Sequence, residues 1–264
     1  QMNVDAAKFF NSCLFSDNPD AKNALSYFVN DRKLSVSTIK HFGLGYAPNS
    51  FDVFLKHMLA KGYTHDELVA GYLCSKSDRG HYFDSFRNRV MFPIIDVRGN
   101  VIAFSGRALD DSPAKYMNSP ETPVFHKGSN IFSLNIAKQY SAKDGLILVE
   151  GNMDAVSLYS FGFPNAVAGL GTALTDQQAQ LLKRYSPLVY ICYDNDEAGT
   201  KAAEKAIDIL SAAGIKLKVL SYKDAKDPDE YLRKKGAESF KKVISSALSV
   251  TEYKILNIRK KYNL

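Results

Sequence analysis

The stretch LILVEGNMDAVSLYSFGFPNAVAGLGTALT (residues 146–175) alternates short apolar runs with segments of helical pattern, and the alternation continues beyond it. It predicts four short apolar strands, at residues 146–149, 166–170, 188–193 and 215–220. Three helices separate these strands: one begins near Met153, one begins at Thr175, with Gln178 at capping-box spacing, and one spans residues 198–213. Strands that alternate with helices in this way predict a parallel sheet with helices on both faces.

Acidic residues lie just beyond three of these strands. They are Glu150 and Asp154 after the first, Asp194 and Asp196 after the third, and Asp227 and Asp229 after the fourth. We expect them to lie close together, because ligands of open parallel sheets bind where the carboxyl ends of the strands meet. Crowded carboxylates repel one another unless a cation neutralises them, and oxygen ligands suit Mg²⁺ or Mn²⁺ better than Zn²⁺. A single acid of this kind is often only a helix cap, so the metal site is inferred from the joint pattern.

The region before this sheet has a different pattern. Residues 21–32 and 51–61 carry apolar side chains at helical spacing. Residues 89–96 and 101–107 are rich in β-forming residues and flank the turn Val97-Arg98-Gly99-Asn100, which predicts an antiparallel hairpin. After the fourth strand of the parallel sheet, the chain becomes helical and basic. The sequence therefore predicts α+β structure, then α/β structure, then helices.

The composition is that of a folded, water-soluble protein. Of the 264 residues, 45% are hydrophobic and 23% are charged. No apolar run approaches the roughly 18 residues that suggest a membrane span, and the N-terminal residues show no signal peptide. Cys13, Cys74 and Cys192 are isolated, which argues against a disulfide scaffold and against a cysteine zinc site. We expect a reducing, cytoplasmic setting and no membrane partner.

The net charge of +6 is unevenly distributed. Residues 233–264 carry nine Lys or Arg against Glu238 and Glu252, so that this segment alone holds seven positive charges and the rest is nearly neutral. A basic segment can contact nucleic-acid phosphates, or it can be the solvated face of amphipathic helices. Charge alone leaves both interpretations open.

Several segments together resemble a known family. Residues 146–175, YICYDNDEAGTKAAEKA (190–206) and KDPDEYL (226–232) resemble the Toprim domain of bacterial DnaG-type primases. Toprim domains also occur in topoisomerases, nucleases and recombination-repair proteins, so this part alone leaves the function open. Three upstream segments resemble motifs that belong to primases: LSVSTIKHFGLGYAP (34–48), FRNRVMFPIIDVRGNVIAFSGRAL (86–109) and AKYMNSPETPVFHKGSNIF (114–132).

The resemblance implies a fold and an activity. The α/β fold would comprise an α+β N-terminal subdomain with the basic motif (1–140), a Toprim parallel-sheet subdomain (141–223) and a C-terminal helical segment, expected to be truncated (224–264). The activity would be that of a DNA-dependent RNA polymerase. It would use ribonucleoside triphosphates to start short primers on a single-stranded DNA template, acting as a cytoplasmic monomer at the bacterial replication fork.

The resemblance also gives roles to the acids. Glu150 matches the acid that acts in catalysis beside the metals, and Asp194 and Asp196 match the D-x-D metal ligands. Asp154, Asp227 and Asp229 match the remaining acids of the cluster. Two or more Mg²⁺ or Mn²⁺ ions would activate the primer 3′-hydroxyl and hold the triphosphate, and no zinc is expected in this chain.

A basic and polar set is matched in the upstream region. Its members face template and nucleotide in the family, and they are Arg89, Arg107, Lys115, Asn118 and Lys127, with Arg87, Tyr116 and His126 as lower-ranked neighbours. Lysines and arginines would bind phosphate oxygens, where affinity is electrostatic and falls with salt. Of the two neighbouring arginines, we expect Arg89 to face the template. His126 is at least as easily explained as a hydrogen-bonded structural histidine.

The chain departs from the family pattern in two places. Asn195 stands where the D-x-D usually has Gly, and we expect it to tolerate a left-handed backbone there. Asn152 stands where an aromatic residue is common, which points to altered local packing. Full-length primases also carry a zinc-binding domain and a helicase-binding domain. We expect the zinc-binding domain and the replicative helicase to act through regions that this chain lacks.

Two other interpretations remain open at this point. A Toprim nuclease or topoisomerase-like DNA-cleavage module would use the same acids. However, strand passage needs a nucleophilic tyrosine, and nothing marks one of the 15 Tyr residues as such. A non-catalytic nucleic-acid-binding protein with a degenerate site is the third interpretation, and intact acids after three strands argue against it.

Overall fold

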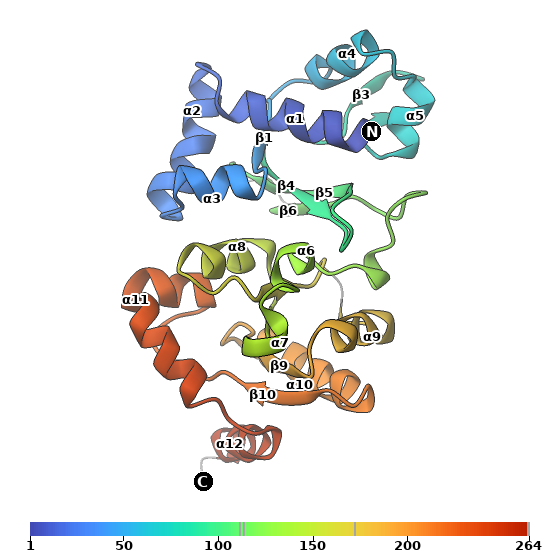
Figure 1. The fold of residues 1–264 in the computed structure, drawn as a ribbon. Helices are drawn as coiled ribbons and strands as arrows, with labels where there is room; N and C mark the ends of the chain where they lie inside the picture. The colour runs from blue at the N-terminus through green and yellow to red at the C-terminus, as the bar shows by residue number, and fades with distance from the viewer. Residues whose placement is uncertain (111, 113, 172, 263–264) are drawn as a thin grey trace. The chain divides into compact units, whose positions relative to one another are not determined.

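The chain forms two compact units, Gln1–Lys127 (unit 1) and Gly128–Leu264 (unit 2), each with its own sheet (Figure 1). The structure is a computed structural model. It describes residues 1–110, 112, 114–171 and 173–262, with side chains described up to residue 259.

Unit 2 is built on a four-stranded parallel sheet. Its strands are β7 (Leu146–Val149), β8 (Ala166–Ala168), β9 (Leu188–Ile191) and β10 (Lys216–Val219). They lie in the order β10-β9-β7-β8, and each neighbouring pair is parallel. All four residues of β7 are buried, as expected for a central strand with both faces covered. The predicted α/β sheet is confirmed, and β7 and β9 end side by side at one edge.

Three helices connect these strands: α8 (Asn152–Ser160), α9 (Asp176–Tyr185) and α10 (Glu197–Ala212). The crossover through α8 runs in one direction across the sheet, and those through α9 and α10 run in the other. Right-handed crossovers therefore place α8 on one face and α9 and α10 on the opposite face (Figure 1). The predicted capping box is confirmed. The Thr175 hydroxyl accepts the Gln178 N–H at 3.1 Å, and the Gln178 side chain accepts the Thr175 N–H at 3.1 Å.

Helices also flank the sheet in sequence. The short helices α6 (Leu134–Ala137) and α7 (Ser141–Asp144) precede β7, while α11 (Pro228–Ser245) and α12 (Val250–Tyr262) follow β10. Helix α11 packs on α8 and bends at Gly236, whose φ of 77° few other residues adopt. Helix α12 packs on β10. The predicted helical segment after the sheet is confirmed.

Unit 1 holds an antiparallel sheet. Its strands are β1 (Gly45–Ala47), β4 (Arg89–Ile95), β5 (Val101–Ala108) and β6 (Tyr116–Asn118), in the order β1-β4-β5-β6. The predicted hairpin is β4–β5. Its turn is fixed by Asp96, whose carboxylate accepts the N–H groups of Arg98 and Asn100 at 2.9 Å each. Strands β1 and β6 were not predicted, because three residues are too few to show an alternating pattern.

Helices and a small hairpin surround this sheet. The helices are α1 (Met2–Leu14), α2 (Pro19–Ser26), α3 (Val36–His41), α4 (Val53–Ala60) and α5 (His65–Ala70), and the hairpin consists of β2 (Cys74–Lys76) and β3 (Tyr82–Asp84). Aromatic rings fill the core between helices and sheet. Phe10 stacks on Phe54 with ring centroids 5.0 Å apart and meets the edge of Phe104 at 5.4 Å. This core belongs to unit 1 alone, since every residue in it precedes residue 128.

One predicted helix has a different end. The sequence predicts a helix over residues 21–32, whereas α2 ends at Ser26 and continues as a π-helical turn, η1 (Tyr27–Asp31). The Arg32 N–H then donates to the Tyr27 carbonyl at 3.0 Å, a hydrogen bond between residues five apart. The apolar pattern is the same for both kinds of turn, so the sequence could not distinguish them. In the described part of the chain, no helix is both long enough and apolar enough to span a membrane.

Candidate metal and nucleic-acid site

The acids at the ends of β7 and β9 are in direct contact. Glu150 is the first residue after β7, and its Oε1 accepts the backbone N–H of Asp194 at 2.9 Å. Parallel pairing of β7 with β9 brings the two strand ends together, and this hydrogen bond links the first residue after β7 to the third residue after β9. Two acids that lie 44 positions apart in sequence therefore share one site, as the strand pattern predicts.

Asp194 has a strongly perturbed carboxyl group. Burial, followed by the negative charges of Glu150, Asp227 and Asp196, raises its pKa to about 7, while Lys226 opposes the rise. The pKa of Glu150 is also raised, first by burial and then by Asp196, although the Asp194 N–H counteracts this. Each shift has the cause expected of like charges brought together in a partly buried site. Three neighbouring carboxylates thus act on Asp194 at this edge of the sheet.

Two of these carboxylates also cap helices. Asp196 Oδ1 accepts the Gly199 N–H at 2.8 Å at the start of α10, and Asp227 Oδ1 accepts the Glu230 N–H at 2.7 Å at the start of α11. Each carboxylate uses one oxygen in this way. Its second oxygen makes no hydrogen bond to another described residue. Capping and ligand binding are therefore compatible, and the caps hold both acids in place.

The middle residue of the D-x-D joins two loops. The Asn195 side-chain amide donates to the carbonyls of Tyr222 and Ala225 at 3.0 Å each, and its backbone N–H donates to Lys226 at 2.8 Å. We expected Asn195 to adopt a left-handed backbone in place of the usual glycine. Its φ is not positive, so that expectation is wrong. The amide instead holds the loop that leads to Asp227 against the loop that carries Asp194.

The other two predicted acids have different surroundings. Asp229 is 1% exposed, and its Oδ2 pairs with Arg233 Nε and Nη2 at 3.1 Å each. It is thus compensated by an arginine rather than left open toward a cation. Asp154 lies in the first turn of α8, and its Oδ2 occupies the space that a side chain at residue 151 would need. A Cβ at residue 151 would stand 2.8 Å from this oxygen, so the Asp154 carboxylate would have to turn away.

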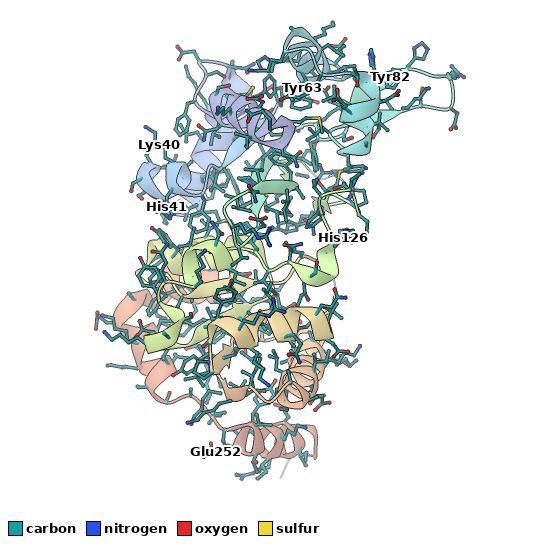
Figure 2. The ribbon with its side chains drawn as sticks, turned by 45° about the vertical axis from the view of Figure 1, so that its right-hand side comes forward. Lys40, His41, Tyr63, Tyr82, His126 and Glu252 are labelled. Atoms are coloured by element: carbon teal, nitrogen blue, oxygen red, sulfur yellow. The ribbon has the colours of Figure 1, made fainter. Side chains whose placement is uncertain are left out.

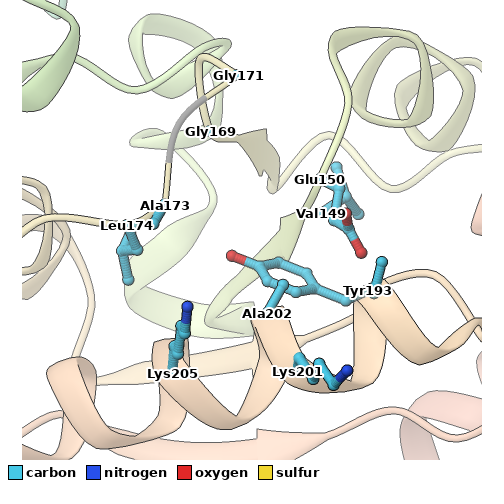
Figure 3. A pocket seen from close by; sticks show the side chains of 11 residues that line it. Val149, Glu150, Gly169, Gly171, Ala173, Leu174, Tyr193, Lys201, Ala202 and Lys205 are labelled. Atoms are coloured by element: carbon cyan, nitrogen blue, oxygen red, sulfur yellow. The ribbon is translucent and has the colours of Figure 1, made fainter.

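A cavity of about 430 Å³ opens beside Glu150 (Figure 3). It is lined by Tyr193, two residues after β9, by Lys201 and Lys205 from α10, and by the Gly169 backbone. Lys201 is paired with Glu197 at 2.6 Å, whereas no ion pair of Lys205 occurs among the described residues. The cavity therefore combines an acid, an aromatic ring and two ammonium groups.

In unit 1, the structure differs from the sequence expectation for Arg89. We expected its guanidinium to face the template, but Arg89 is only 5% exposed. Its Nη1 donates to the carbonyls of Ala114 at 2.8 Å, Gly106 at 3.3 Å and Lys115 at 3.4 Å. Arg89 lies on the face of the sheet that packs on the aromatic core. Its guanidinium donates to backbone carbonyls of the segment before β6. Arg89 therefore has a structural role that does not depend on contact with a template.

Arg87 and Arg107 are more accessible and stack on aromatic rings. The Arg87 guanidinium lies 4.7 Å from the ring centre of Phe51 and 5.3 Å from that of Phe83. The Arg107 guanidinium lies 4.4 Å from the ring centre of Tyr27. Both arginines are half-buried, so part of each remains open to solvent.

The remaining polar candidates follow along β6 and the loop after it. Tyr116 and Asn118 project on the same face of the sheet as Arg107, because Tyr116 is the register partner of Arg107. Lys115 is exposed. Glu121 holds the next segment, since its carboxylate contacts His126 Nδ1 at 2.8 Å and accepts the Lys127 N–H at 2.9 Å (Figure 2 labels His126). His126 is thus hydrogen-bonded to a carboxylate.

Family models and relatives match both units. Residues 9–138 match the DNA primase catalytic core, N-terminal domain, and residues 147–232 match the Toprim-like family. The DNA primase of Clostridium acetobutylicum is 46% identical over 263 residues, which span 100% of this chain and 43% of that protein.

A solved structure, described as the DnaG primase catalytic domain bound to ssDNA, is 36% identical, with a TM-score of 0.88. The alignment covers 99% of this chain and 84% of that chain. The chain belongs to the DnaG primase family. The α/β fold and the primase-like upstream motifs that the sequence predicted are thereby confirmed.

The match is to part of a DnaG primase. The chain spans less than half the length of the curated relative from Clostridium acetobutylicum. The Aquifex aeolicus primase structure, described as containing zinc binding and RNA polymerase domains, is 37% identical, with a TM-score of 0.86, and the chain covers 64% of it.

Toprim-containing DnaG primases use divalent metal ions, which raises the question of whether the acids here fit one. Among the described residues, no three His, Cys, Asp or Glu side chains already stand as a metal-binding group. The chemistry nevertheless fits a hard cation. The donors are carboxylate oxygens, and the pKa of Asp194 is raised first by burial and then by three neighbouring carboxylates, which is the environment that a hard cation would stabilise.

The sequence did not predict the roles of three residues at this DnaG site, although Asn195 was noted there as a departure from the family pattern. Asn195 links two loops, Lys226 opposes the negative charge at Glu150 and Asp194, and Gly199 gives the Asp194 carbonyl and Glu150 Oε1 room beside α10. Only Gly199 leaves a sequence signal, as a glycine in the first turn of an otherwise strong helix. The other two depend on contacts between loops.

Proposed function

We propose that this chain is the polymerase core of a primase that synthesises short RNA primers on single-stranded DNA from ribonucleoside triphosphates. One observation carries the proposal. Glu150 accepts the Asp194 N–H at 2.9 Å at the carboxyl edge of a Toprim-like sheet, and Asp196 and Asp227 lie near enough to contribute to the raised pKa of Asp194. Nucleotidyl transfer needs such a site, because its catalysis is mostly positioning and charge stabilisation.

In this proposal the acids hold Mg²⁺ or Mn²⁺. Glu150, Asp194 and Asp196 would bind the ions, and Asp227 would support them. Asp154 would act from the outer edge of the cluster, whereas Asp229 would orient the start of α11 through Arg233. Bound cations would lower the pKa of the primer 3′-hydroxyl and neutralise triphosphate charge. Asn195 would keep the two acidic loops together while the ions exchange.

Unit 1 would supply contacts to nucleic acid and nucleotide. We assign phosphate binding to Lys115, Lys127 and Arg107, and hydrogen bonding to phosphate or ribose to Asn118. Tyr116, 45% exposed, would stack on a base, and His126 would brace the Lys127 segment through Glu121.

Arg87 and Arg89 would act differently. Because its hydrogen bonds are buried, Arg89 would hold the segment that carries Lys115 in place and would not contact the template. Arg87, half-buried between two phenylalanine rings, would contact phosphate from the rim.

The organisation of the whole protein is also part of the proposal. We retain the division into an N-terminal subdomain (1–140), a Toprim subdomain (141–223) and a helical segment (224–264) as functional modules. A cytoplasmic monomer at the bacterial replication fork is the proposed working form. The replicative helicase and a zinc-binding domain would engage regions outside these residues. The Aquifex aeolicus structure, described as containing zinc binding and RNA polymerase domains, supports only the zinc-binding part of this proposal.

The test is primer synthesis by the wild type and two isosteric variants, Glu150→Gln and Asp194→Asn. The protein is mixed with single-stranded DNA, four labelled ribonucleotides and either Mg²⁺ or Mn²⁺. We expect short RNA from the wild type and a loss of at least about a hundredfold in each variant, equivalent to about 2.7 kcal/mol of barrier. Asp194→Asn should hold or raise the free energy of unfolding, because it removes one of several mutually repelling carboxylates.

Asp208→Asn is the matched control, because Asp208 is an exposed acid of α10 that pairs with Lys254 at 3.3 Å, away from the acidic edge. It should retain full synthesis. Normal RNA yield from Asp194→Asn would contradict the metal assignment. Metal-dependent nicking of the DNA with no RNA would instead favour the DNA-cleavage module.

A further inference from the structure

Tyr222 contacts both chain neighbours of Asp194. Its hydroxyl donates to the Tyr193 carbonyl at 3.0 Å, and its own carbonyl accepts the Asn195 side-chain amide at 3.0 Å. Tyr222 is the third residue after β10, whereas residues 193–195 belong to the loop after β9. One residue of the neighbouring loop thus holds the chain directly before Asp194 and directly after it.

The hydroxyl of Tyr222 acts on the same peptide group that Glu150 uses. The Tyr193 carbonyl and the Asp194 N–H belong to one planar peptide unit. Tyr222 donates to the oxygen of this unit, and its N–H donates to Glu150 Oε1 at 2.9 Å. Because the unit is planar, a hydrogen bond at its oxygen also limits the direction in which its N–H points. Hydrogen bonds in such a chain polarise one another, which makes the N–H a better donor to Glu150.

The phenol ring of Tyr222 is held in place by other aromatic rings. Tyr222 is only 6% exposed, and its ring packs on that of Tyr231 from α11 with ring centroids 5.4 Å apart. The Tyr231 ring in turn contacts that of Phe240 at 6.0 Å. Turning the Tyr222 ring would displace a second buried ring, because protein interiors are closely packed. The hydroxyl therefore has a fixed position beside the Tyr193 carbonyl.

The surroundings of this hydroxyl keep it protonated. Burial raises the pKa of Tyr222 well above its usual range, and four negative groups raise it further, namely Cys192, Asp194, Asp154 and Asp227. The phenol is therefore a hydrogen-bond donor throughout the range of pH in which proteins stay folded. A neutral donor orients the acidic loop without compensating its negative charge. That charge remains available to a hard cation.

We propose that Tyr222 is a positioning residue that fixes the chain on both sides of Asp194 and thereby sets the separation of Glu150 and Asp194 for a divalent cation. Tyr222 acts through the backbone and touches neither the cation nor the nucleotide. The inference rests on the proposed function, in which the two acids bind Mg²⁺ or Mn²⁺. Cation binding itself can be measured without DNA, nucleotide or synthesis.

The hydroxyl of Tyr222 can be removed without removing its ring. Phenylalanine at residue 222 would preserve the packing on Tyr231. The Tyr193 carbonyl would then lose its donor, since no other described residue donates to it. The peptide unit would be less restrained, and the Asp194 N–H would lose its alignment with Glu150. The expected loss is therefore one of geometry at the acidic cluster.

The test compares Tyr222→Phe with the wild type in two assays. The first titrates Mn²⁺ alone and follows the electron paramagnetic resonance signal of the free ion, with Asp194→Asn defining the binding that belongs to the acidic cluster. We expect this binding to weaken by about threefold to tenfold in Tyr222→Phe, as for the loss of one hydrogen bond. The second assay is primer synthesis, which should need a Mn²⁺ concentration higher by the same factor. DNA affinity, measured by anisotropy of labelled oligothymidine, should be unchanged.

Tyr231→Phe is the matched control. It makes the same chemical change in the same pair of buried rings. The Tyr231 hydroxyl contacts Ser239 Oγ at 2.8 Å, and among the described residues it makes no contact with the acidic cluster. Tyr231→Phe should therefore match the wild type in Mn²⁺ affinity and in the Mn²⁺ dependence of synthesis.

A merely structural role of the Tyr222 hydroxyl would lower the unfolding temperature of Tyr222→Phe but leave its Mn²⁺ affinity unchanged, and that result would overturn the proposal. If Tyr222→Phe fails to fold, Asn195→Ala carries the test, because it removes the contact on the other side of Asp194. Wild-type Mn²⁺ affinity in Asn195→Ala would then contradict the inference. If the wild type makes no RNA, the proposed function fails, while the Mn²⁺ titration still decides the role of Tyr222.

Discussion

The acidic cluster leaves no room for a side chain at Gly199. It lies in the first turn of α10, where the chain passes directly over the loop that carries Asp194. A Cβ at this position would overlap the Asp194 carbonyl and stand 2.8 Å from Glu150 Oε1. The backbone of Asp194 cannot retreat without breaking the hydrogen bond that its N–H donates to Glu150. The glycine is therefore required by close approach and not by backbone conformation.

Gly199→Ala is expected to lower the free energy of unfolding by about 1–3 kcal/mol, the usual range for overpacking. It should also reduce primer synthesis by more than the loss of folded protein explains, since Glu150 and Asp194 must separate. Urea denaturation and synthesis at matched folded concentration measure the two effects.

Gly128→Ala is the control, because its Cβ would meet Thr175 at an ordinary 3.5 Å and should change stability by less than about 0.5 kcal/mol. Equal stability and synthesis in both alanine variants would refute the steric argument.

Helix α4 shows that an element can depend on a distant residue. Its N-cap residue, Asp52, makes no side-chain capping hydrogen bond. Asp84, at the end of β3, accepts the N–H groups of Phe54 at 3.0 Å and Leu55 at 2.8 Å instead. Burial raises the pKa of Asp84 despite these two hydrogen bonds. The helix is thus capped across the fold by a carboxylate that is costly to ionise.

Asp84→Asn should destabilise the protein at neutral pH by about 1–3 kcal/mol, because one of the two N–H groups loses its acceptor. The pH dependence has a definite sign. A carboxyl whose pKa is higher in the folded state than in the unfolded state stabilises the fold fully below the unfolded pKa, and this contribution is lost as pH rises through the folded pKa.

The stability advantage of wild type over Asp84→Asn should therefore grow as the pH falls from 7 toward 4. Chemical denaturation across this range, with the variant as reference, cancels the other titrating groups. An advantage that shrinks on acidification would show that hydrogen bonding, and not burial, dominates the Asp84 carboxyl.

At the scale of the whole molecule, the two units have separate cores. Phe104 belongs to the aromatic core of unit 1, whereas Leu148, fully buried, lies in the central strand of the unit 2 sheet. A substitution in one core should lower the stability of the unit that contains it more than that of the other unit.

We expect denaturant unfolding to proceed in two steps, which intrinsic tyrosine fluorescence and circular dichroism can follow. Phe104→Ala should shift one step by about 3–5 kcal/mol, and Leu148→Ala should shift the other by about 2–5 kcal/mol. A single transition moved equally by both variants would show that the units unfold as one cooperative body.

The chain sequence by itself determined the parallel sheet, the hairpin β4–β5 and the edge at which Glu150, Asp194 and Asp227 meet. These features follow from local periodicity and from connectivity, because the residue after a parallel strand must emerge at the carboxyl edge of the sheet.

Only the tertiary structure decided what each polar side chain does. Arg89 and Arg107 lie on the same strand pair and look alike in sequence, yet one is buried against carbonyls and the other stacks on Tyr27. Asp84 and Asn195 likewise act on segments about 30 residues away. Such roles depend on which distant backbone groups are left without partners after folding, and no local pattern records that.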